Sequence, residues 1–137
     1  MNTKAILIGL NDRKVLQEGW YGLEKSPDGL LYRASSVRAE WKIAGFGGRI
    51  RLTLLLAARP EHVGKPLQAT VSTETGTKFE FQLGTNQWTT RNGELILPAD
   101  GKIALEVYTP WSPHQLYQNG DARSLGILLS ALHIRTA

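Results

Sequence analysis

The sequence predicts an all-β fold, an antiparallel β-sandwich of jelly-roll-like topology with about ten strands, in a single domain over residues 1–137. Turn dipeptides such as Asp28-Gly29, Asn92-Gly93 and Asp100-Gly101 recur at short intervals along the chain. Between them lie segments of strand length in which apolar and polar residues alternate, as expected of strands with one buried and one solvated face. This spacing is typical of sandwiches, and 137 residues suffice for a core of that kind.

In the first half of the chain, strands are expected at about 3–9, 17–24, 30–36, 39–43, 49–58 and 67–73. The alternation is clearest in 49–56, where Ile50, Leu52, Leu54 and Leu56 alternate with Arg49, Arg51, Thr53 and Leu55. Leu55 is therefore an apolar residue on a polar face, which hints at a contact surface. The glycine-rich segment 45–48 leads into a strand and lacks the lysine of a phosphate-binding loop, so we expect a turn there.

In the second half, four strands at about 77–83, 87–91, 94–97 and 102–109 are expected to form an antiparallel meander. A three-residue loop at 99–101 would place Leu97 opposite Ile103, and a two-residue turn at Asn92-Gly93 would place Leu97 opposite Trp88. Both pairings join residues of one face, so Trp88 is expected to face the interior. The segment 124–134 has leucines at helical spacing, but Gly126 and the all-β context favour a helical turn at 122–125 followed by a last strand at 126–135.

Composition and charge exclude several function classes. Sixteen Lys and Arg against twelve Asp and Glu give a net charge of +4, but the cations are scattered, so nucleic-acid binding ranks third among the hypotheses. The chain has no cysteine, and His62, His114 and His133 show neither metal-ligand spacing nor a catalytic partner motif. We therefore expect no enzyme, no metal and no cofactor, with His133 half-buried in the last strand. No stretch is apolar and long enough for a signal peptide or membrane span, and we expect a cytoplasmic protein without a membrane partner.

The strongest functional signal is the long connection after Tyr108, over residues 109–123. Two prolines stiffen it, which lowers the entropy lost on ordering. It combines flat rings with amide groups, the combination that the C–H faces and hydroxyls of a sugar require. The predicted ligand-binding residues are Trp111, His114, Gln115, Tyr117 and Asn119. In the alternative interpretation, Trp111 and Leu116 close one end of the sandwich, and Asp121 pairs with Arg123 or caps the following turn.

A second motif surrounds the turn at Asp28-Gly29, with Gly19-Trp20-Tyr21-Gly22-Leu23-Glu24 before it and Tyr32-Arg33 after it. If Asp28-Gly29 is a two-residue turn, Glu24 lies opposite Arg33 and the two form a cross-strand ion pair. We favour a structural clasp over an alternative in which Glu24 and Arg33 bind sugar hydroxyls, because such pairs are common in sheets.

These two motifs, together with Asp121-Ala122-Arg123-Ser124-Leu125-Gly126-Ile127, resemble a bacterial β-sandwich module found beside, or fused to, glycosyltransferases and methyltransferases of surface-polysaccharide gene clusters. The resemblance covers about 18–36 and 102–135, and Asp-x-Arg-x-Leu-Gly is its most specific part. It implies a non-catalytic accessory role in glycan assembly, with a glycan as ligand and a glycosyltransferase as partner. Ala34 stands where the family often carries a second aromatic residue, which argues against an aromatic platform there.

The leading hypothesis is thus a carbohydrate-binding or glycosyltransferase-accessory module. The alternative is a protein-interaction or oligomerisation module, including a homo-oligomer, that positions a partner enzyme through a sheet face carrying Leu55 and through Tyr108.

Overall fold

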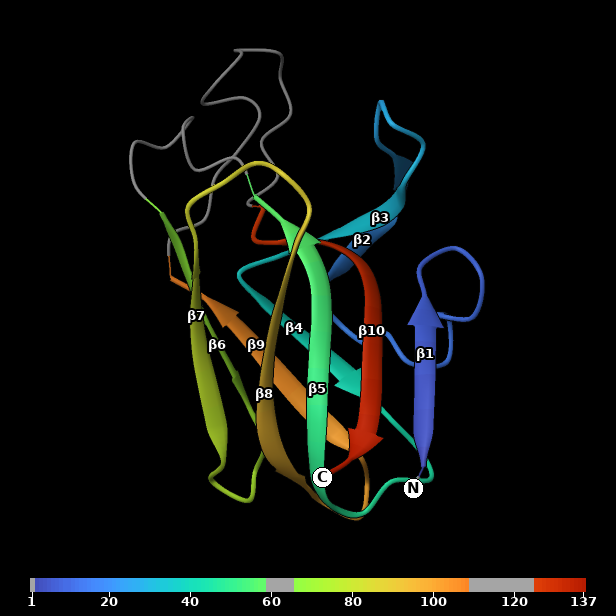
Figure 1. Cartoon of the computed structure of the whole chain (residues 1–137), viewed down its shortest axis with the longest axis vertical. Coiled ribbons are helices and arrows are strands. Elements are labelled where there is room, and N and C mark those ends of the chain that lie inside the picture. Colours follow the sequence, from blue (N-terminus) through green and yellow to red (C-terminus); the bar gives the residue numbers. More distant parts are fainter. Residues whose placement is uncertain (1, 59–65, 109–124) are drawn as a thin grey trace.

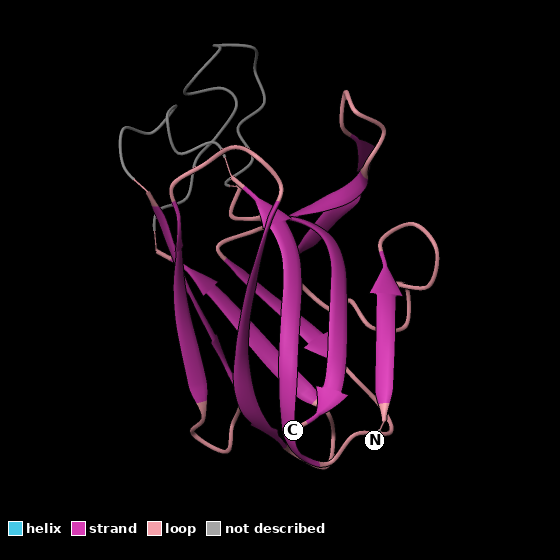
Figure 2. Ribbon diagram, in the orientation of Figure 1, coloured by secondary structure: helices cyan, strands magenta, loops and turns pink. Residues whose placement is uncertain are grey.

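The computed structural model describes residues 2–58, 66–108 and 125–137. Within these residues ten strands form two antiparallel sheets that pack face to face, as Figure 1 shows. Figure 2 shows strands and loops but no helix in the described part of the chain. The predicted all-β sandwich is confirmed.

The six-stranded sheet contains β1 (Thr3–Leu7), β2 (Trp20–Lys25), β3 (Leu31–Ser35), β5 (Gly48–Ala57), β8 (Thr89–Leu97) and β10 (Leu128–Thr136). Its order is β2-β3-β10-β5-β8, and β1 also pairs with β10. The four-stranded sheet contains β4 (Arg38–Lys42), β6 (Leu67–Ser72), β7 (Lys78–Leu83) and β9 (Lys102–Val107), in the order β4-β9-β6-β7.

The core lies between the two sheets and follows the predicted alternation. In β5 the four inward residues Ile50, Leu52, Leu54 and Leu56 are fully buried. They face the inward residues of the other sheet, among them Leu67, Val71, Ile103 and Leu105. Ala34, which stands where the family often carries a second aromatic residue, is likewise fully buried and belongs to this core.

The predicted meander over residues 77–109 is wrong. β7 and β9 belong to the four-stranded sheet whereas β8 lies in the six-stranded sheet, so the chain changes sheet on both sides of β8. Residues 89–97 form one continuous strand along β5, and Asn92 and Gly93 pair with Thr53 and Leu52 instead of forming a turn. Gly93 has a packing role, because a Cβ there would lie 2.3 Å from Cγ of Phe79.

The ladder at the end of the chain settles the ambiguity of the leucine-rich segment. β10 pairs with β5 along most of its length and with β1 on its other side, so residues 128–136 are a strand. The helical turn expected at 122–125 lies outside the described residues apart from Leu125. His133 is exposed on the outer face of β10, not half-buried as predicted, because Leu132 and Ile134 take the inward positions.

Candidate functional site

The turns between β2 and β3 and between β7 and β8 lie at the same end of the sandwich, as Figure 1 shows. A pocket of about 420 Å³ is lined by residues of these turns. We call it the end pocket. It is lined by the hairpin loop and β3 on one side, by the loop before β8 on another, and by the ends of β5 and β10. The lining residues are Ser26, Pro27, Asp28, Tyr32, Ala57, Asn86, Gln87, Trp88 and Leu128.

Two aromatic rings form the apolar part of the end pocket. Tyr32 lies on β3 and Trp88 ends the loop between β7 and β8; their ring centroids are 5.7 Å apart, and the rings are tilted by 54°. Both side chains are half-buried, so each ring is held by the protein while part of its surface remains accessible. This exposure corrects the prediction that Trp88 faces the interior, which depended on the incorrect turn at Asn92-Gly93.

Hydrogen bonds within the hairpin loop place the polar groups beside these rings. The Ser26 hydroxyl donates to the Asp28 carboxylate and accepts the backbone N–H of Leu30 at 3.0 Å. The N–H of Ser26 donates to the carbonyl of Leu30 at 2.8 Å, which closes the loop. On the opposite side, Asn86 and Gln87 bring two amide groups to the lining. The end pocket therefore combines aromatic surface, a carboxylate and amide donors and acceptors.

Arg91 holds the loop that carries Asn86, Gln87 and Trp88. Its Nε and Nη2 atoms donate to the carbonyl of Gln82 in β7 at 3.2 and 3.0 Å, and Nη1 donates to the carbonyl of Thr90 in β8 at 2.9 Å. One guanidinium thus joins the two ends of the loop across the change of sheet. Such a planar group with several donors can fix the geometry of two strands at once.

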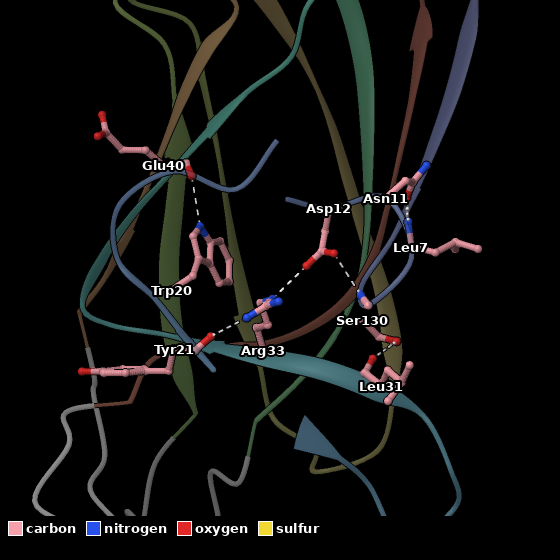
Figure 3. A network of polar contacts seen from close by, with 10 residues as sticks. Leu7, Asn11, Asp12, Trp20, Tyr21, Leu31, Arg33, Glu40 and Ser130 are labelled. Atoms are coloured by element: carbon pink, nitrogen blue, oxygen red, sulfur yellow. Dashed lines mark hydrogen bonds and ion pairs between the residues drawn. The ribbon is translucent and has the colours of Figure 1, made fainter. Parts of the chain in front are cut away.

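The predicted ion pair between Glu24 and Arg33 is wrong. The register places Leu23 opposite Arg33 and Glu24 opposite Tyr32, because the hairpin closes through the five-residue loop 26–30 and not through a two-residue turn. Arg33 instead donates through Nε to Asp12 Oδ2 at 2.8 Å, as Figure 3 shows. Asp12 lies 21 residues earlier, and no local sequence signal connects the two.

The Asp12–Arg33 pair ties the segment after β1 to the hairpin that forms one side of the end pocket. The Asp12 side chain is only 3% exposed, and its Oδ1 accepts the N–H of Gly9 at 3.0 Å. Arg33 also donates through Nη1 to the carbonyl of Tyr21 at 3.3 Å (Figure 3). Its guanidinium is thus engaged by the protein, and its role is to position the hairpin.

Trp20 has a structural role as well. Its Nε1 donates to the carbonyl of Glu40 at 3.0 Å, and its ring lies 5.6 Å from that of Trp41, centroid to centroid. The described end of the Asp-x-Arg-x-Leu-Gly element packs closely against β3. A Cβ on Gly126 would lie 2.5 Å from Ser35 Oγ, and the Gly126 N–H donates to the carbonyl of Ser35 at 2.7 Å. The glycine permits this close approach of the two backbones.

The predicted binding residues Trp111, His114, Gln115, Tyr117 and Asn119 lie outside the described residues, as do Asp121 and Arg123. Before these residues the structure describes β9, which ends at Val107, and after them it describes the chain from Leu125 into β10. Leu128, the first residue of β10, lines the end pocket. The sequence did not predict Tyr32, Asn86 and Gln87 as pocket residues. The β2–β3 hairpin and the loop before β8 are far apart in the sequence, and only the fold brings them together.

Metal and membrane signals are negative within the described ranges. No group of three or more His, Cys, Asp or Glu side chains there is arranged to hold a metal ion. The same ranges contain no helix that could cross a membrane.

The comparisons with known proteins establish the fold. No protein-family model matches the chain, and no curated protein matches its sequence. Among solved structures it is similar to the C-terminal CBM6 of LamC, a marine laminarinase from Zobellia galactanivorans, with 16% identity, a TM-score of 0.55, and 98% of this chain and 100% of that one covered.

Two further structures show the same likeness. The CBM35 from Cellvibrio japonicus Abf62 has 11% identity and a TM-score of 0.63, with 99% of this chain and 94% of that one covered. The CBM36-1 domain of a xylanase from the hindgut metagenome of Trinervitermes trinervoides has 12% identity and a TM-score of 0.58, with 99% and 98% covered. The chain therefore has the β-sandwich fold of these carbohydrate-binding modules.

Proposed function

We propose that this protein binds glycans without transforming them, and that the end pocket holds the sugar. The observation that carries the proposal is the pair of half-buried rings, Tyr32 and Trp88, beside the amides of Asn86 and Gln87. Sugar rings present apolar C–H faces for stacking and hydroxyls for hydrogen bonding, and the pocket offers partners for both. Carbohydrate-binding modules among the structures of similar fold support the same ligand class.

The size of the site sets the expected affinity. Stacking and each hydrogen bond contribute about 1 kcal/mol after desolvation, so one or two sugar rings should bind with micromolar to millimolar Kd. The hairpin and loop are fixed by Asp12–Arg33 and by Arg91 before ligand arrives, which reduces the entropy lost on binding.

A narrower version places the protein in bacterial glycan assembly, as a cytoplasmic accessory to a glycosyltransferase. Its support is the resemblance carried by the motifs at 19–24, 32–33 and 121–127. Ala34, where the family often carries a second aromatic residue, lies in the core and departs from this resemblance. Co-purification with a glycosyltransferase encoded beside it would support this version. A protein that stays monodisperse and binds no such enzyme would contradict it.

A second candidate function is supported by the outer face of the six-stranded sheet. The register places Leu7 beside Ala131 and Ala131 beside Leu55, so an apolar row crosses β1, β10 and β5. Leu7 is 46% exposed and Leu55 half-buried. Such a row can bind another protein or a second copy of the chain. Light scattering of the wild type and of Leu55→Gln tests self-association through this row. A dimer that is lost in the variant supports self-association, and a wild type that is monomeric rejects it.

The test of glycan binding uses a panel of neutral oligosaccharides derived from mannan, xylan and β-1,3-glucan, followed by isothermal titration calorimetry. Trp88→Ala should remove binding at the end pocket, whereas Trp88→Phe, which keeps a ring, should retain part of it. Unfolding curves of both variants control for lost structure. If Trp88→Ala binds every ligand as the wild type does, the end pocket is not the site.

A further inference from the structure

The two sheets differ in the balance of charge that their strands carry. The strands of the four-stranded sheet contain four Lys or Arg and three Glu, and each of these glutamates lies 3.1–3.8 Å from a cation. In the six-stranded sheet, β1, β5, β8 and β10 contain five Lys or Arg and one Glu. These four strands stand side by side in Figure 1, and they carry an excess of positive charge.

The register places three of these arginines on the outer face of the sheet. Arg51 pairs with Arg135 of β10 on one side and with Glu94 of β8 on the other. Arg49 lies two residues before Arg51, so its side chain is on the same face, while the intervening Ile50 is fully buried toward the core. We call Arg49, Arg51 and Arg135 the basic patch.

Only part of the charge of the basic patch is neutralised within the protein. Glu94 lies 3.5 Å from Arg49 and 3.3 Å from Arg51, so one carboxylate is shared by two guanidinium groups. Arg51 also donates through Nη1 to Asn92 Oδ1 at 2.6 Å, which holds its guanidinium on the outer face. Arg135 is half-buried and has no ion pair among the described residues. The basic patch therefore presents unpaired positive charge to solvent.

The apolar row of Leu7, Ala131 and Leu55 lies on the same outer face as the basic patch. Leu55 and Arg51 are four residues apart on β5, a distance of about 13 Å along the strand. The row between them contains Ala5, His133 and Thr53. The outer face thus changes from apolar to cationic over a short distance.

These two features together select the class of partner. A nucleic acid or an acidic polysaccharide would neutralise the arginines but leave the leucines of the apolar row exposed to water. A second copy of this chain would bring two basic patches into one interface, where like charges repel. A protein surface that carries carboxylates beside apolar side chains complements both features.

We propose that the outer face of the six-stranded sheet binds an acidic protein surface, whose carboxylates pair with the basic patch and whose apolar side chains cover the apolar row. The proposal rests on the second candidate function, since it uses the same apolar row, and it names the partner class. It is independent of glycan binding, because no residue of the basic patch or of the apolar row lines the end pocket.

The test is an NMR titration with a short, Glu-rich synthetic peptide that contains Leu at intervals. The backbone amides of Ala131, His133 and Arg135 report on the outer face, and the side-chain amides of Asn86 and Gln87 report on the end pocket. The peptide should shift the first set and leave the second in place. The shifts should weaken as NaCl is added, because salt screens exposed charges. The same peptide with Gln in place of every Glu should bind at least about fivefold more weakly.

Charge variants test whether the position of the arginines matters. Arg51→Gln combined with Arg135→Gln should weaken binding of the Glu-rich peptide about fivefold. The matched control is Lys42→Gln combined with Lys78→Gln, which removes the same charge from the other sheet and should change the affinity by less than about twofold. Unfolding curves of both double variants control for lost structure. Equal losses in the two double variants would show an effect of net charge alone and would refute the proposal.

Three further results would also overturn it. The first is the absence of any shift with the Glu-rich peptide. The second is an equal shift of the outer-face signals by oligothymidylate or oligogalacturonate, which would assign the basic patch to an anionic polymer. The third is a wild-type dimer that is lost in Leu55→Gln, which would assign the face to a second copy of the chain. In that last case the second candidate function stands and only the acidic partner is rejected.

Discussion

The Asp12–Arg33 pair provides the sharpest test of the structure that supports the end pocket. Asp12→Ala removes a nearly buried carboxylate that accepts from Arg33 Nε at 2.8 Å and from the Gly9 N–H at 3.0 Å. A hydrogen bond to a charged group contributes about 1.5–3 kcal/mol and a neutral one about 1 kcal/mol. The Arg33 side chain remains 22% exposed, so water compensates part of the loss. We expect a decrease of about 2–3 kcal/mol in the free energy of unfolding.

Urea unfolding and thermal melts measure this effect. For a domain of this size, about 1 kcal/mol corresponds to roughly 3–4 °C, so Tm should fall by about 6–12 °C. The matched control is Glu24→Ala, which should change stability by less than about 0.5 kcal/mol, since Glu24 lies opposite Tyr32. A double-mutant cycle with Arg33→Ala should show coupling of about 1–2 kcal/mol to Asp12 and almost none to Glu24. Coupling to Glu24 instead, or a loss below about 0.5 kcal/mol for Asp12→Ala, would refute the assigned register.

Three further changes test other parts of the account. Arg91→Gln, which breaks the link between the two ends of the loop, should weaken end-pocket binding about fivefold by calorimetry. Equal affinity in this variant would show that the loop needs no support from Arg91. Trp41→Phe should lower the free energy of unfolding, measured by urea unfolding, by less than about 1.5 kcal/mol, because it removes a buried Nε1 that has no hydrogen-bond partner among the described residues. A loss above about 3 kcal/mol would contradict this. Gly93→Ala should lower the free energy of unfolding by about 1–3 kcal/mol, because the added Cβ clashes with Phe79. In the double variant with Phe79→Ala, part of this loss should be relieved, and strictly additive losses would contradict the clash.

Local alternation was sufficient to predict the fold class and most strands. β5 is the clearest case, since its apolar period of two coincides with its four fully buried residues. Pairing was harder to predict. Asn92-Gly93 has the composition of a tight turn, but Gly93 is a glycine because the ring of Phe79 occupies the space of its side chain. Turn chemistry and close packing both select glycine, and the sequence does not distinguish them.

The candidate site was predictable only in its chemistry. The end pocket combines aromatic and amide groups on loops, the same chemistry that the sequence predicts for 109–123, and that prediction lies outside the described residues. The end pocket's own residues could not be predicted, because Tyr32 and Trp88 meet only when hairpin and loop are brought to one end of the sandwich. The hairpin register depended in turn on Ser26, whose side chain and backbone close a five-residue loop around Asp28 and Gly29. Contacts over such separations leave no periodic signal in the sequence.

The central claim is most directly tested at the indole N–H of Trp88, whose NMR signal is identified by its absence in Trp88→Phe. On titration with the neutral oligosaccharides, we predict that this signal shifts in a saturable manner together with the Asn86 and Gln87 amides, while the buried indole of Trp41 stays in place. A Trp88 signal unmoved by every sugar, or one that moves only in step with Trp41, would contradict glycan binding at the end pocket.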